Sequence, residues 1–284
     1  IKLVRLHSLK GRYKIITFEG GFHGRTIGVL SIMNKPLYKD GMGPFVPNAS
    51  VLPFNDVPAL RSGIDDSTCA VFIECLQGEG GVRWVTSEVV ETLVELREKY
   101  GFLIVADEVQ AGGGRTGTFF SFDRFGFRPD IVTLAKGIGG GLPLGAMLVT
   151  EELADVWGSG RHGTTFGGNA VACAAGSAVL DLLGEGLMEN ARIVGEYMLN
   201  RFHELESAYP SLVADVRGAG AMAGIELNVP AGPFVDRMLE RDIVINATAD
   251  TVLRFLPPLI FQNEHVDHVV GALGDIFADY VRGA

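Results

Sequence analysis

The chain has 284 residues, a length that supports a large core in one or two domains. Its 24 basic and 34 acidic residues give a formal net charge of −10. It has neither a basic block nor aromatic residues interleaved with lysine and arginine, which argues against nucleic acid as a partner. No apolar stretch approaches about 18 residues, which argues against a membrane span.

Hydrophobic residues make up 47% of the chain and glycine is abundant at 38 residues, which is typical of an α/β protein with many turns. The three cysteines form no CxxC pair, and their number is odd: Cys69, Cys75 and Cys173. Reduced thiols in a cytoplasmic protein are the simplest interpretation.

The first residues, 1–6, have neither an initiator methionine nor the charged-then-apolar pattern of a signal peptide. Their apolar spacing is that of the middle of an amphipathic helix. We therefore expect the chain to have been cut at its N-terminus.

Strand-like and helix-like stretches then alternate, which indicates a wound α/β architecture. The predicted strands are apolar at consecutive positions, so we expect a mainly parallel sheet that is covered on both faces: residues 14–18, 51–53, 70–75, 102–106, 131–134 and 146–149. One clear helix spans 87–100, with Thr86 or Ser87 at its start and Gly101 at the position of a C-terminal cap.

The pattern is helical from residue 169 to about 209, with a break near 184–186, and short strands and helices follow Pro210. The later strands are predicted at 223–227 and 252–256, and the later helices at 234–241 and 264–281. We interpret residues 1–182 as a large α/β domain and residues 183–284 as a smaller C-terminal α/β domain.

Lys136 and Asp107 form the most informative pair in the sequence. Each stands just after a short apolar run that is predicted to be a buried strand. In a wound sheet, ligands gather beyond the carboxyl ends of the strands. An amine that forms a covalent bond to an aldehyde, and an acid against a pyridine nitrogen, are the two groups that a pyridoxal phosphate enzyme requires.

Three competing motifs are weaker. An apolar run followed by Asp-Glu also suits a nucleotide hydrolase, but that class requires a G-x-x-x-x-G-K-[ST] loop, and this sequence contains no Gly-Lys dipeptide. Residues 112–117 match G-x-G-x-x-G, yet an aromatic stretch follows them instead of a helix, so a flexible turn is the better interpretation. The His265-x-x-His268 spacing has no further ligand, and we predict a solvated helix and no metal site.

Other polar residues give weak signals on their own. In Phe22-His23-Gly24-Arg25-Thr26 an aromatic ring could stack on a planar cofactor and an arginine could grip a carboxylate, while the histidine could be a general base or a plain turn residue. Residues 163–169 precede a predicted helix, so they could bind a phosphate or simply cap that helix. Glu74, Glu79 and Arg254 have no evident local partner.

Taken together, these segments resemble the class III aminotransferases, the ornithine aminotransferase group of fold-type I pyridoxal phosphate enzymes. The matching stretches occur in the family's order and span nearly all the chain: residues 22–26, 74–81, 107–110, 114–117, 134–145, 163–169 and 254–259. Within the family the sequence is most similar to acetylornithine aminotransferases, chiefly through residues 20–26 and 163–166.

The resemblance implies cofactor roles for the matching residues. Lys136 would bind pyridoxal 5′-phosphate covalently and later move a proton, and Asp107 would pair with the pyridine nitrogen. Gln110 would hydrogen-bond the ring oxygen and Phe22 would stack on the ring. The cofactor-binding stretch 107–110 also includes Glu108 and Val109.

The resemblance also implies substrate and partner contacts. Arg25 and Thr164 would contact acetylornithine, and Thr165 would reach the phosphate of the cofactor in the partner subunit, which implies a homodimer with shared active sites. Arg254 would bind the α-carboxylate of glutamate or 2-oxoglutarate. Glu79 would mask Arg254 when the amine of the other substrate enters, which lets one pocket accept both.

The activity that this resemblance implies is transfer of the 5-amino group of N2-acetylornithine to 2-oxoglutarate, a step of arginine biosynthesis. Ornithine, succinylornithine and 4-aminobutyrate remain alternative amine donors. A non-catalytic protein on the same scaffold, or a lyase or racemase with the same cofactor, is also possible, but retention of Glu79 and Arg254 favours transamination.

The sequence departs from the family's pattern at two places. Cys75 stands where the family usually has proline, which we expect to matter little. The family's N-terminal segment, with a Ser-Gly-containing phosphate loop and residues that help to select the substrate, is absent from the sequence. We therefore expect the chain as given to bind pyridoxal phosphate weakly.

Overall fold

The computed structural model describes residues 1–8 and 11–283, which form two compact units. The first unit contains residues 1–77, 85–110 and 122–180. The second contains residues 181–284 together with two earlier stretches, 78–84 and 111–121. The change between units at 180/181 lies close to the predicted domain boundary, but the sequence did not reveal that the two earlier stretches join the second unit.

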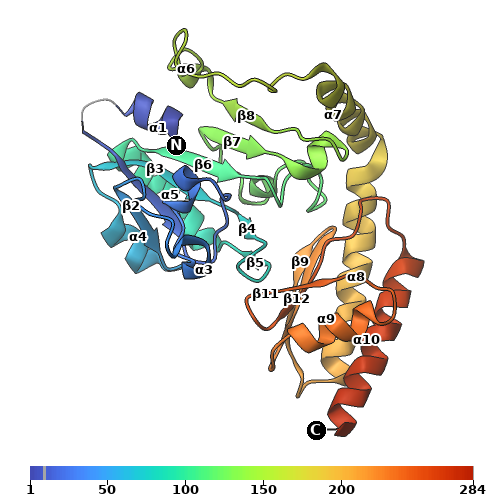
Figure 1. The fold of residues 1–284 in the computed structure, drawn as a ribbon. Helices are drawn as coiled ribbons and strands as arrows, with labels where there is room; N and C mark the ends of the chain where they lie inside the picture. Colours follow the sequence, from blue (N-terminus) through green and yellow to red (C-terminus); the bar gives the residue numbers. More distant parts are fainter. Residues whose placement is uncertain (9–10, 284) are drawn as a thin grey trace. The chain divides into compact units, whose positions relative to one another are not determined.

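A six-stranded sheet in the order β2-β1-β3-β6-β7-β8 forms the centre of the first unit (Figure 1). Neighbours from β2 to β7 are parallel, and only β8 is antiparallel to its neighbour. The predicted fold class, a mainly parallel wound sheet, is therefore confirmed. The strands are β1 (Lys14–Phe18), β2 (Ala49–Leu52), β3 (Thr68–Ile73), β6 (Leu103–Asp107), β7 (Ile131–Leu134) and β8 (Ala146–Val149).

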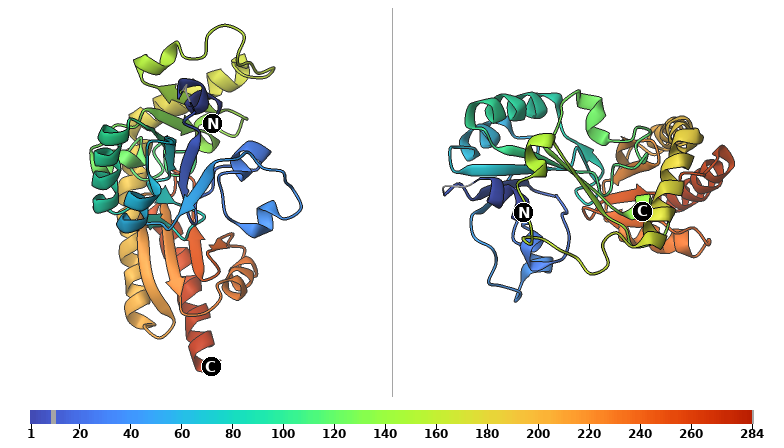
Figure 2. Two further views of the ribbon diagram at one scale, coloured as in Figure 1. Left: turned by 90° about the vertical axis from the view of Figure 1, so that its left-hand side faces the viewer. Right: turned by 90° about the horizontal axis from the view of Figure 1, so that it is seen from above.

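Helices cover both faces of this sheet (Figure 2). Leu3 and Val4 of α1 (Lys2–His7) belong to an apolar cluster with Ile15, Phe72 and Val105 from the strands. Helices α4 (Val57–Gly63) and α5 (Ser87–Tyr100) lie on the opposite face. Burial on both faces explains the continuous apolar runs of the central strands.

Helix α5 has the bounds that the sequence predicted, because both of its ends carry caps. The hydroxyl of Thr86 accepts a hydrogen bond from the amide of Val89 at 3.4 Å, and Gly101 adopts the left-handed conformation at φ 65°. The remaining short elements of this part of the chain are α2 (Ile27–Leu30), α3 (Pro36–Lys39), β4 (Leu76–Gln77), β5 (Arg83–Trp84), η1 (Ser121–Phe125), η2 (Lys136–Gly139) and α6 (Glu151–Ala154).

The helical run after residue 169 is interrupted where the sequence predicted a break. Helix α7 (Ala170–Leu182) leads into a π-helical segment, η3 (Leu183–Leu187), and α8 (Met188–Ala208) follows. Gly186 within this segment has φ 132°, a conformation outside the helical region that glycine adopts at no steric cost. The interruption separates an apolar helix from an amphipathic one.

A wholly antiparallel sheet in the order β11-β12-β10-β9 forms the centre of the second unit. Leu253 and Phe255 of β12 point to the face where α8 and the other helices pack, and Arg254 between them points to the opposite face. The elements are β9 (Val213–Ala219), β10 (Met222–Leu227), α9 (Gly232–Leu239), β11 (Asn246–Thr248), β12 (Val252–Phe255) and α10 (Asn263–Gly283).

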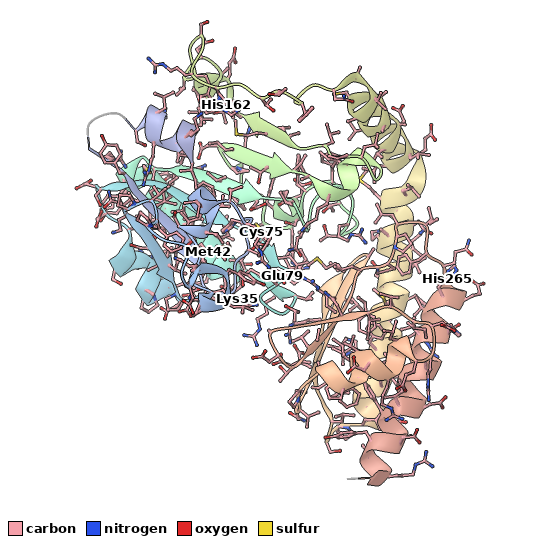
Figure 3. All side chains as sticks on the ribbon, in the orientation of Figure 1. Lys35, Met42, Cys75, Glu79, His162 and His265 are labelled. Carbon is pink, nitrogen blue, oxygen red and sulfur yellow. The ribbon has the colours of Figure 1, made fainter. Side chains whose placement is uncertain are left out.

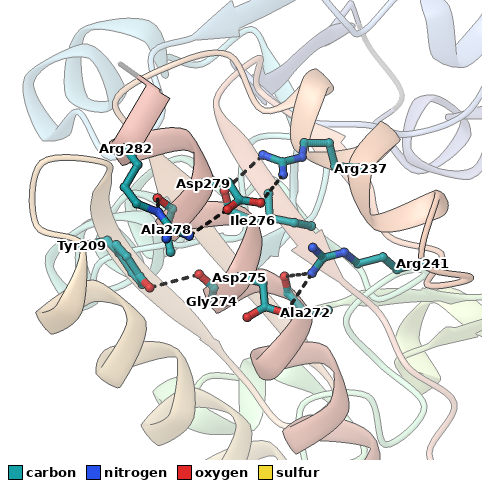
Figure 4. Close-up of polar contacts among 10 residues, drawn as sticks. All are labelled: Tyr209, Arg237, Arg241, Ala272, Gly274, Asp275, Ile276, Ala278, Asp279 and Arg282. Atoms are coloured by element: carbon teal, nitrogen blue, oxygen red, sulfur yellow. Dashed lines mark hydrogen bonds and ion pairs between the residues drawn. The ribbon is translucent and has the colours of Figure 1, made fainter.

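Helix α10 is fastened to its neighbours by side chains that bond to its main chain (Figure 4). Tyr209 donates to the carbonyl of Gly274 at 3.0 Å, and Arg241 donates to the carbonyl of Ala272 at 2.8 Å. Arg237 adds an ion pair of 2.9 Å with Asp279. These contacts, with the shared apolar cluster, fix the helical layer that supports the sheet.

Candidate active site

Asp107 is enclosed by donors from three separate segments. It is the last residue of β6 and is 8% exposed. Its Oδ1 accepts hydrogen bonds from the hydroxyl of Thr133 at 3.1 Å and from the amide of Val109 at 3.2 Å. Its Oδ2 lies 2.8 Å from Nδ1 of His23. Such contacts fix the orientation of the carboxylate.

Lys136 emerges from the next strand along the same edge of the sheet. Strands β6 and β7 are parallel neighbours, with Asp107 opposite Thr133, and Lys136 begins η2 just beyond β7. The lysine is exposed and has φ 54°, an uncommon conformation for a residue other than glycine. Strained backbone of this kind clusters at functional sites. The topology thus brings the two residues to the same edge of the sheet, and their meeting at one pocket stays a prediction.

A second buried acid, Glu74, lies beside this pair. It is 4% exposed and its Oε2 accepts a hydrogen bond from the amide of Phe22 at 2.8 Å. Burial, together with the charge of Asp107, raises the pKa of Glu74 to about 8, although the charges of His23 and Lys136 and the hydrogen bond from Phe22 oppose this change. Glu74 is therefore protonated near neutral pH, which avoids placing a second anion beside Asp107.

The pKa of His23 is also raised, but here burial opposes the change instead of causing it. Its side chain is only 3% exposed, and this burial disfavours the charged ring. The hydrogen bond to Asp107 and the negative charge of Asp107 outweigh the burial and raise the pKa of His23. The sequence left His23 open as a general base or a plain turn residue, and the structure gives it a different contact, a hydrogen bond to Asp107.

Phe22 and Arg25 lie on the turn after β1, together with Tyr38. The ring of Phe22 meets that of Tyr38 edge-on, with centroids 6.0 Å apart. The guanidinium of Arg25 lies 3.6 Å from the centroid of the Tyr38 ring, a stacked cation–π contact. Arg25 as a whole residue is exposed.

The stretch that follows Asp107 has mixed roles. The amide of Val109 bonds to Asp107, whereas the buried carboxylate of Glu108 accepts a hydrogen bond from the amide of Phe122 at 3.3 Å. The structure thus gives Glu108 a contact with the protein's own main chain. Gln110 is partly exposed.

Residues 163–169 form an exposed segment that leads into α7. The side chain of Asn169 accepts hydrogen bonds from the amides of Val171 and Ala172, both at 3.1 Å, so it caps the helix. The hydroxyl of Thr164 accepts a hydrogen bond from the amide of Gly167 at 3.3 Å. Thr165 is exposed. The helix-cap interpretation therefore holds for Asn169, and the predicted contacts of the two threonines stay predictions.

In the second unit, Arg254 and Glu79 form an ion pair with 2.8 Å between Nη1 and Oε1. Glu79 lies on the connection between β4 and β5 and is labelled in Figure 3. Arg254 is 6% exposed and its Nε donates to Oδ1 of Asn246 at 3.2 Å. The side chain of Glu79 is 28% exposed. Residues 175 positions apart are thus paired, although the sequence showed no local partner for either.

Sequence reasoning missed two residues of these sites and two of their contacts. Thr133 lies within an apolar strand and Asn246 lies in a strand of only three residues, so neither stood out as a polar motif. The partnership of His23 with Asp107 joins positions 84 residues apart. The amide that bonds to Glu74 is 52 residues away. Strand-end position was the one sequence signal that could have singled out Glu74, just after β3.

The competing motifs have ordinary structural roles. Residues 112–117 form a turn in which Gly114 has φ 81°, and a Cβ atom there would lie 2.7 Å from Leu183. The predicted turn is present, and it is closely packed at Gly114. His265, at the start of α10 in Figure 3, accepts a hydrogen bond from the amide of Gln262 at 3.0 Å, which is a helix-end contact.

An amine and an enclosed carboxylate at adjacent strand ends of a mainly parallel sheet are the two groups that a pyridoxal phosphate enzyme requires. Residues 1–277 match the family described as aminotransferase class III, and the chain belongs to this family. Its cofactor is pyridoxal phosphate.

The chain is similar to acetylornithine aminotransferases of several organisms. It is 42% identical over 268 residues to an acetylornithine aminotransferase of Methanocaldococcus jannaschii, which covers 94% of this chain and 67% of the relative. The same identity over 267 residues links it to an acetylornithine aminotransferase of Aquifex aeolicus, with 94% and 69% covered.

Solved structures show the same fold. The ornithine aminotransferase of Toxoplasma gondii matches with a TM-score of 0.93 at 28% identity and covers 100% of this chain and 70% of its own. The N-acetylornithine aminotransferase of Stenotrophomonas maltophilia matches with a TM-score of 0.82 at 28% identity, with 100% and 72% covered.

The residues of the first unit fit the cofactor. Asp107 offers a carboxylate that is fixed in orientation and still 10% exposed at its side chain, which suits a protonated ring nitrogen. Lys136 offers an exposed amine on the neighbouring strand end. The aromatic ring of Phe22 lies on the turn that bonds to Glu74, and it is partly exposed.

Proposed function

We propose that this enzyme transfers the 5-amino group of N2-acetylornithine to 2-oxoglutarate, in arginine biosynthesis. The similarity to acetylornithine aminotransferases at 42% identity supports this substrate. The Arg254–Glu79 ion pair is the observation that carries the proposal, because a buried arginine with an exchangeable carboxylate suits an enzyme that must accept a dicarboxylate and an amine in turn.

When bound, pyridoxal phosphate accepts the electrons that remain after a proton leaves the carbon beside the substrate nitrogen. Asp107 would face the ring nitrogen, in the orientation that Thr133 and Val109 fix. Lys136 would hold the cofactor, and its Nζ would take the proton from the carbon that bears the amino group. Phe22 and Gln110 would bind the ring.

Arg254 binds the α-carboxylate of 2-oxoglutarate or glutamate through charge-assisted hydrogen bonds. Glu79 takes the place of that carboxylate when the amine substrate is bound, so the buried guanidinium keeps a counter-charge in both half-reactions. Arg25 and Thr164 contact the acetylated end of the amine substrate.

The decisive experiment identifies the residue that binds the cofactor covalently. Borohydride reduction of the full-length enzyme with its cofactor, followed by peptide mapping, should find the reduced adduct on Lys136. Lys136→Ala should abolish transamination while the protein keeps its fold and its oligomeric state. Turnover in that variant, or an adduct on another residue, would refute the assignment.

The choice of amine donor is tested separately. Ornithine is the main alternative, since an ornithine aminotransferase shares the fold. Succinylornithine and 4-aminobutyrate are further alternatives. The full-length enzyme, assayed with each donor and 2-oxoglutarate, should show its highest kcat/KM with N2-acetylornithine. A higher kcat/KM with another donor would replace the substrate and leave the reaction class intact.

We further propose a homodimer in which Thr165 binds the phosphate in the partner subunit. The first unit exposes large apolar side chains on and around β8 and α7: Met147 at 47%, Leu148 at 44%, Phe166 at 85% and Val171 at 69%. An interface would remove this surface from water.

Mixed subunits of Lys136→Ala and Thr165→Ala proteins should regain about a quarter of the wild-type activity, because each hybrid dimer has one intact site. No recovery, with hybrids present, would exclude shared sites.

One helical run, 170–208, is long and apolar enough to cross a membrane by length and composition. This is weak support for a membrane protein, because helices of soluble proteins pass the same test. Its second half, α8, buries Val194, Met198 and Phe202 in the apolar cluster of the second unit. We propose a cytoplasmic enzyme, in keeping with the exposed free thiol of Cys173.

A further inference from the structure

The loop that carries Glu79 is fastened through its main chain to the helix-free face of the second sheet. The hydroxyl of Thr248, on β11, donates to the carbonyl of Glu79 at 2.6 Å. Nε of Arg217, on β9, donates to the carbonyl of Gly81 at 2.8 Å. Two strands on opposite edges of the sheet therefore hold this short loop.

Close packing restricts the same loop. A Cβ atom at Gly81, where φ is 97°, would lie 3.3 Å from Arg217 and from Ala249. Val82 is fully buried at φ 54°, and a Cβ atom at Gly224 of β10 would lie 3.2 Å from it. A β-branched residue persists in such a conformation only where its surroundings determine the backbone. The loop therefore has one main-chain path.

The arginine is oriented independently of the glutamate. Asn246 stands opposite Arg254 in the pairing of β11 with β12, and its Oδ1 accepts from Nε at 3.2 Å. The ion pair to Glu79 uses a different nitrogen, Nη1. Arg217, the other arginine of this face, pairs with Asp215 and Glu226 at 2.5 and 2.6 Å, so its charge is already balanced by acids other than Glu79.

We propose that Thr248 and Arg217 are positioning residues that fix the main chain of Glu79, and that Asn246 orients Arg254, so that exchange of substrates needs the rotation of one side chain. This inference rests on the proposed transamination. Rotating one glutamate requires the reordering of a single side chain, whereas a mobile loop would have to be ordered residue by residue in each half-reaction.

The hydrogen bonds from Thr248 and Arg217 to the loop of Glu79, called the anchor below, should affect the KM of one substrate more than that of the other. With a fixed main chain, Glu79 returns to Arg254 whenever no carboxylate occupies it. If the anchor is weakened, the arginine is masked less often. The KM for the amine substrate should then rise, because its half-reaction needs a masked arginine, and the KM for the dicarboxylate substrate should stay the same or fall.

Thr248→Val tests this with almost no change of volume, and Thr248→Ser is the matched control that keeps the hydroxyl. In the full-length enzyme we expect Thr248→Val to raise the KM for N2-acetylornithine about three- to tenfold, the range expected for one lost hydrogen bond. Its kcat should stay within about twofold, and Thr248→Ser should resemble the wild type. Equal changes of both KM values would overturn the proposal.

A double-mutant cycle shows whether the effect passes through Glu79. In a Glu79→Gln background, Thr248→Val should no longer change the KM for the amine substrate. An effect of unchanged size in that background would contradict the anchor.

Hydrogen exchange provides a readout that does not depend on activity. Amides of residues 79–82 should exchange faster in Thr248→Val than in the wild type or Thr248→Ser, and unchanged exchange would overturn the anchor. If the wild-type enzyme does not transaminate these substrates, the proposed function fails, while the exchange rates still decide whether Thr248 fixes the loop.

Discussion

Asp107 in the first unit and Glu79 in the second are both carboxylates paired with a basic side chain, but their surroundings differ. The side chain of Asp107 is 10% exposed, and donors from three segments bind its two oxygens. The side chain of Glu79 is 28% exposed, while its main-chain carbonyl is bound by Thr248. In one case the structure fixes the carboxylate itself, and in the other it fixes the backbone that carries it.

This difference matches the two tasks that we assign. A carboxylate that must stay charged through a whole reaction is best enclosed by donors, because moving it would expose buried partners without their hydrogen bonds. A carboxylate that another carboxylate replaces must be able to leave. The carboxylate of Glu79 and the carboxylate of the substrate carry the same charge, so the buried guanidinium of Arg254 is neutralised in both states.

The largest effect is expected at Asp107. Asp107→Asn keeps the shape but removes the anion that raises the pKa of His23, so the buried ring loses its charged partner. Loss of one partner from a buried pair costs about 3–5 kcal/mol of stability, and the rate of transamination should fall by roughly two orders of magnitude or more. Urea unfolding at about pH 6, where His23 is protonated, and single-turnover kinetics measure the two effects.

Asp65→Asn is the matched control, since Asp65 forms an ion pair of 2.9 Å with Lys14 at the surface and is 54% exposed. An exposed pair contributes about 1 kcal/mol or less. If Asp107→Asn destabilised the protein no more than this control, the picture of an enclosed anion would be wrong.

A smaller and more selective effect is expected at Glu79. Glu79→Gln removes the charge that masks Arg254, so the KM for the amine substrate should rise about tenfold, as for the loss of one charge-assisted interaction. The KM for the dicarboxylate substrate should fall, because no protein carboxylate competes for the arginine. Steady-state kinetics with each substrate varied in turn checks this, and Glu204→Gln, at an exposed helix pair, should change neither value.

The sequence predicted the first unit better than the second for a physical reason. Parallel strands buried on both faces are apolar at every position, so β6 and β7 stood out, and their ends located Asp107 and Lys136. Strand β9 was missed because its exposed face carries Asp215 and Arg217 between apolar residues. The prediction divided the chain at a single point for a similar reason. No local pattern in the sequence shows that residues 78–84 belong to the second unit.

Contacts between residues far apart in the sequence explain what else was missed. Strand ends indicate where polar groups gather, but not which of them bond to one another. The pairing of His23 with Asp107 joins residues 84 positions apart, and even the nearby pairing of Arg254 with Asn246 depends on a strand register that the sequence does not specify. The resemblance to a family supplied the Glu79–Arg254 partnership, which spacing alone could not.

The smallest expected effect concerns the pH dependence of stability. Burial raises the pKa of Glu74 from the ordinary 4.5 to about 8, so the folded protein keeps a proton that the unfolded chain releases. The stability of the wild type should therefore fall as the pH rises from about 5 to about 8. His23, whose pKa is also raised, contributes a loss in the same direction. In Glu74→Gln the amide mimics the protonated acid, keeps an acceptor for the amide of Phe22, and should make the fall shallower.

Urea unfolding at several values between about pH 5 and about pH 8 measures the slope, and Glu95→Gln serves as the control. Glu95 is exposed and Arg61 lowers its pKa, so this variant should keep the wild-type slope across the window. A charged Glu74 would stand beside the anion of Asp107. The same comparison therefore also tests whether Glu74 stays neutral in the folded protein. Parallel slopes for Glu74→Gln and the wild type would show that Glu74 is ionised in the folded protein, and the two carboxylates would then have to share the charge of His23.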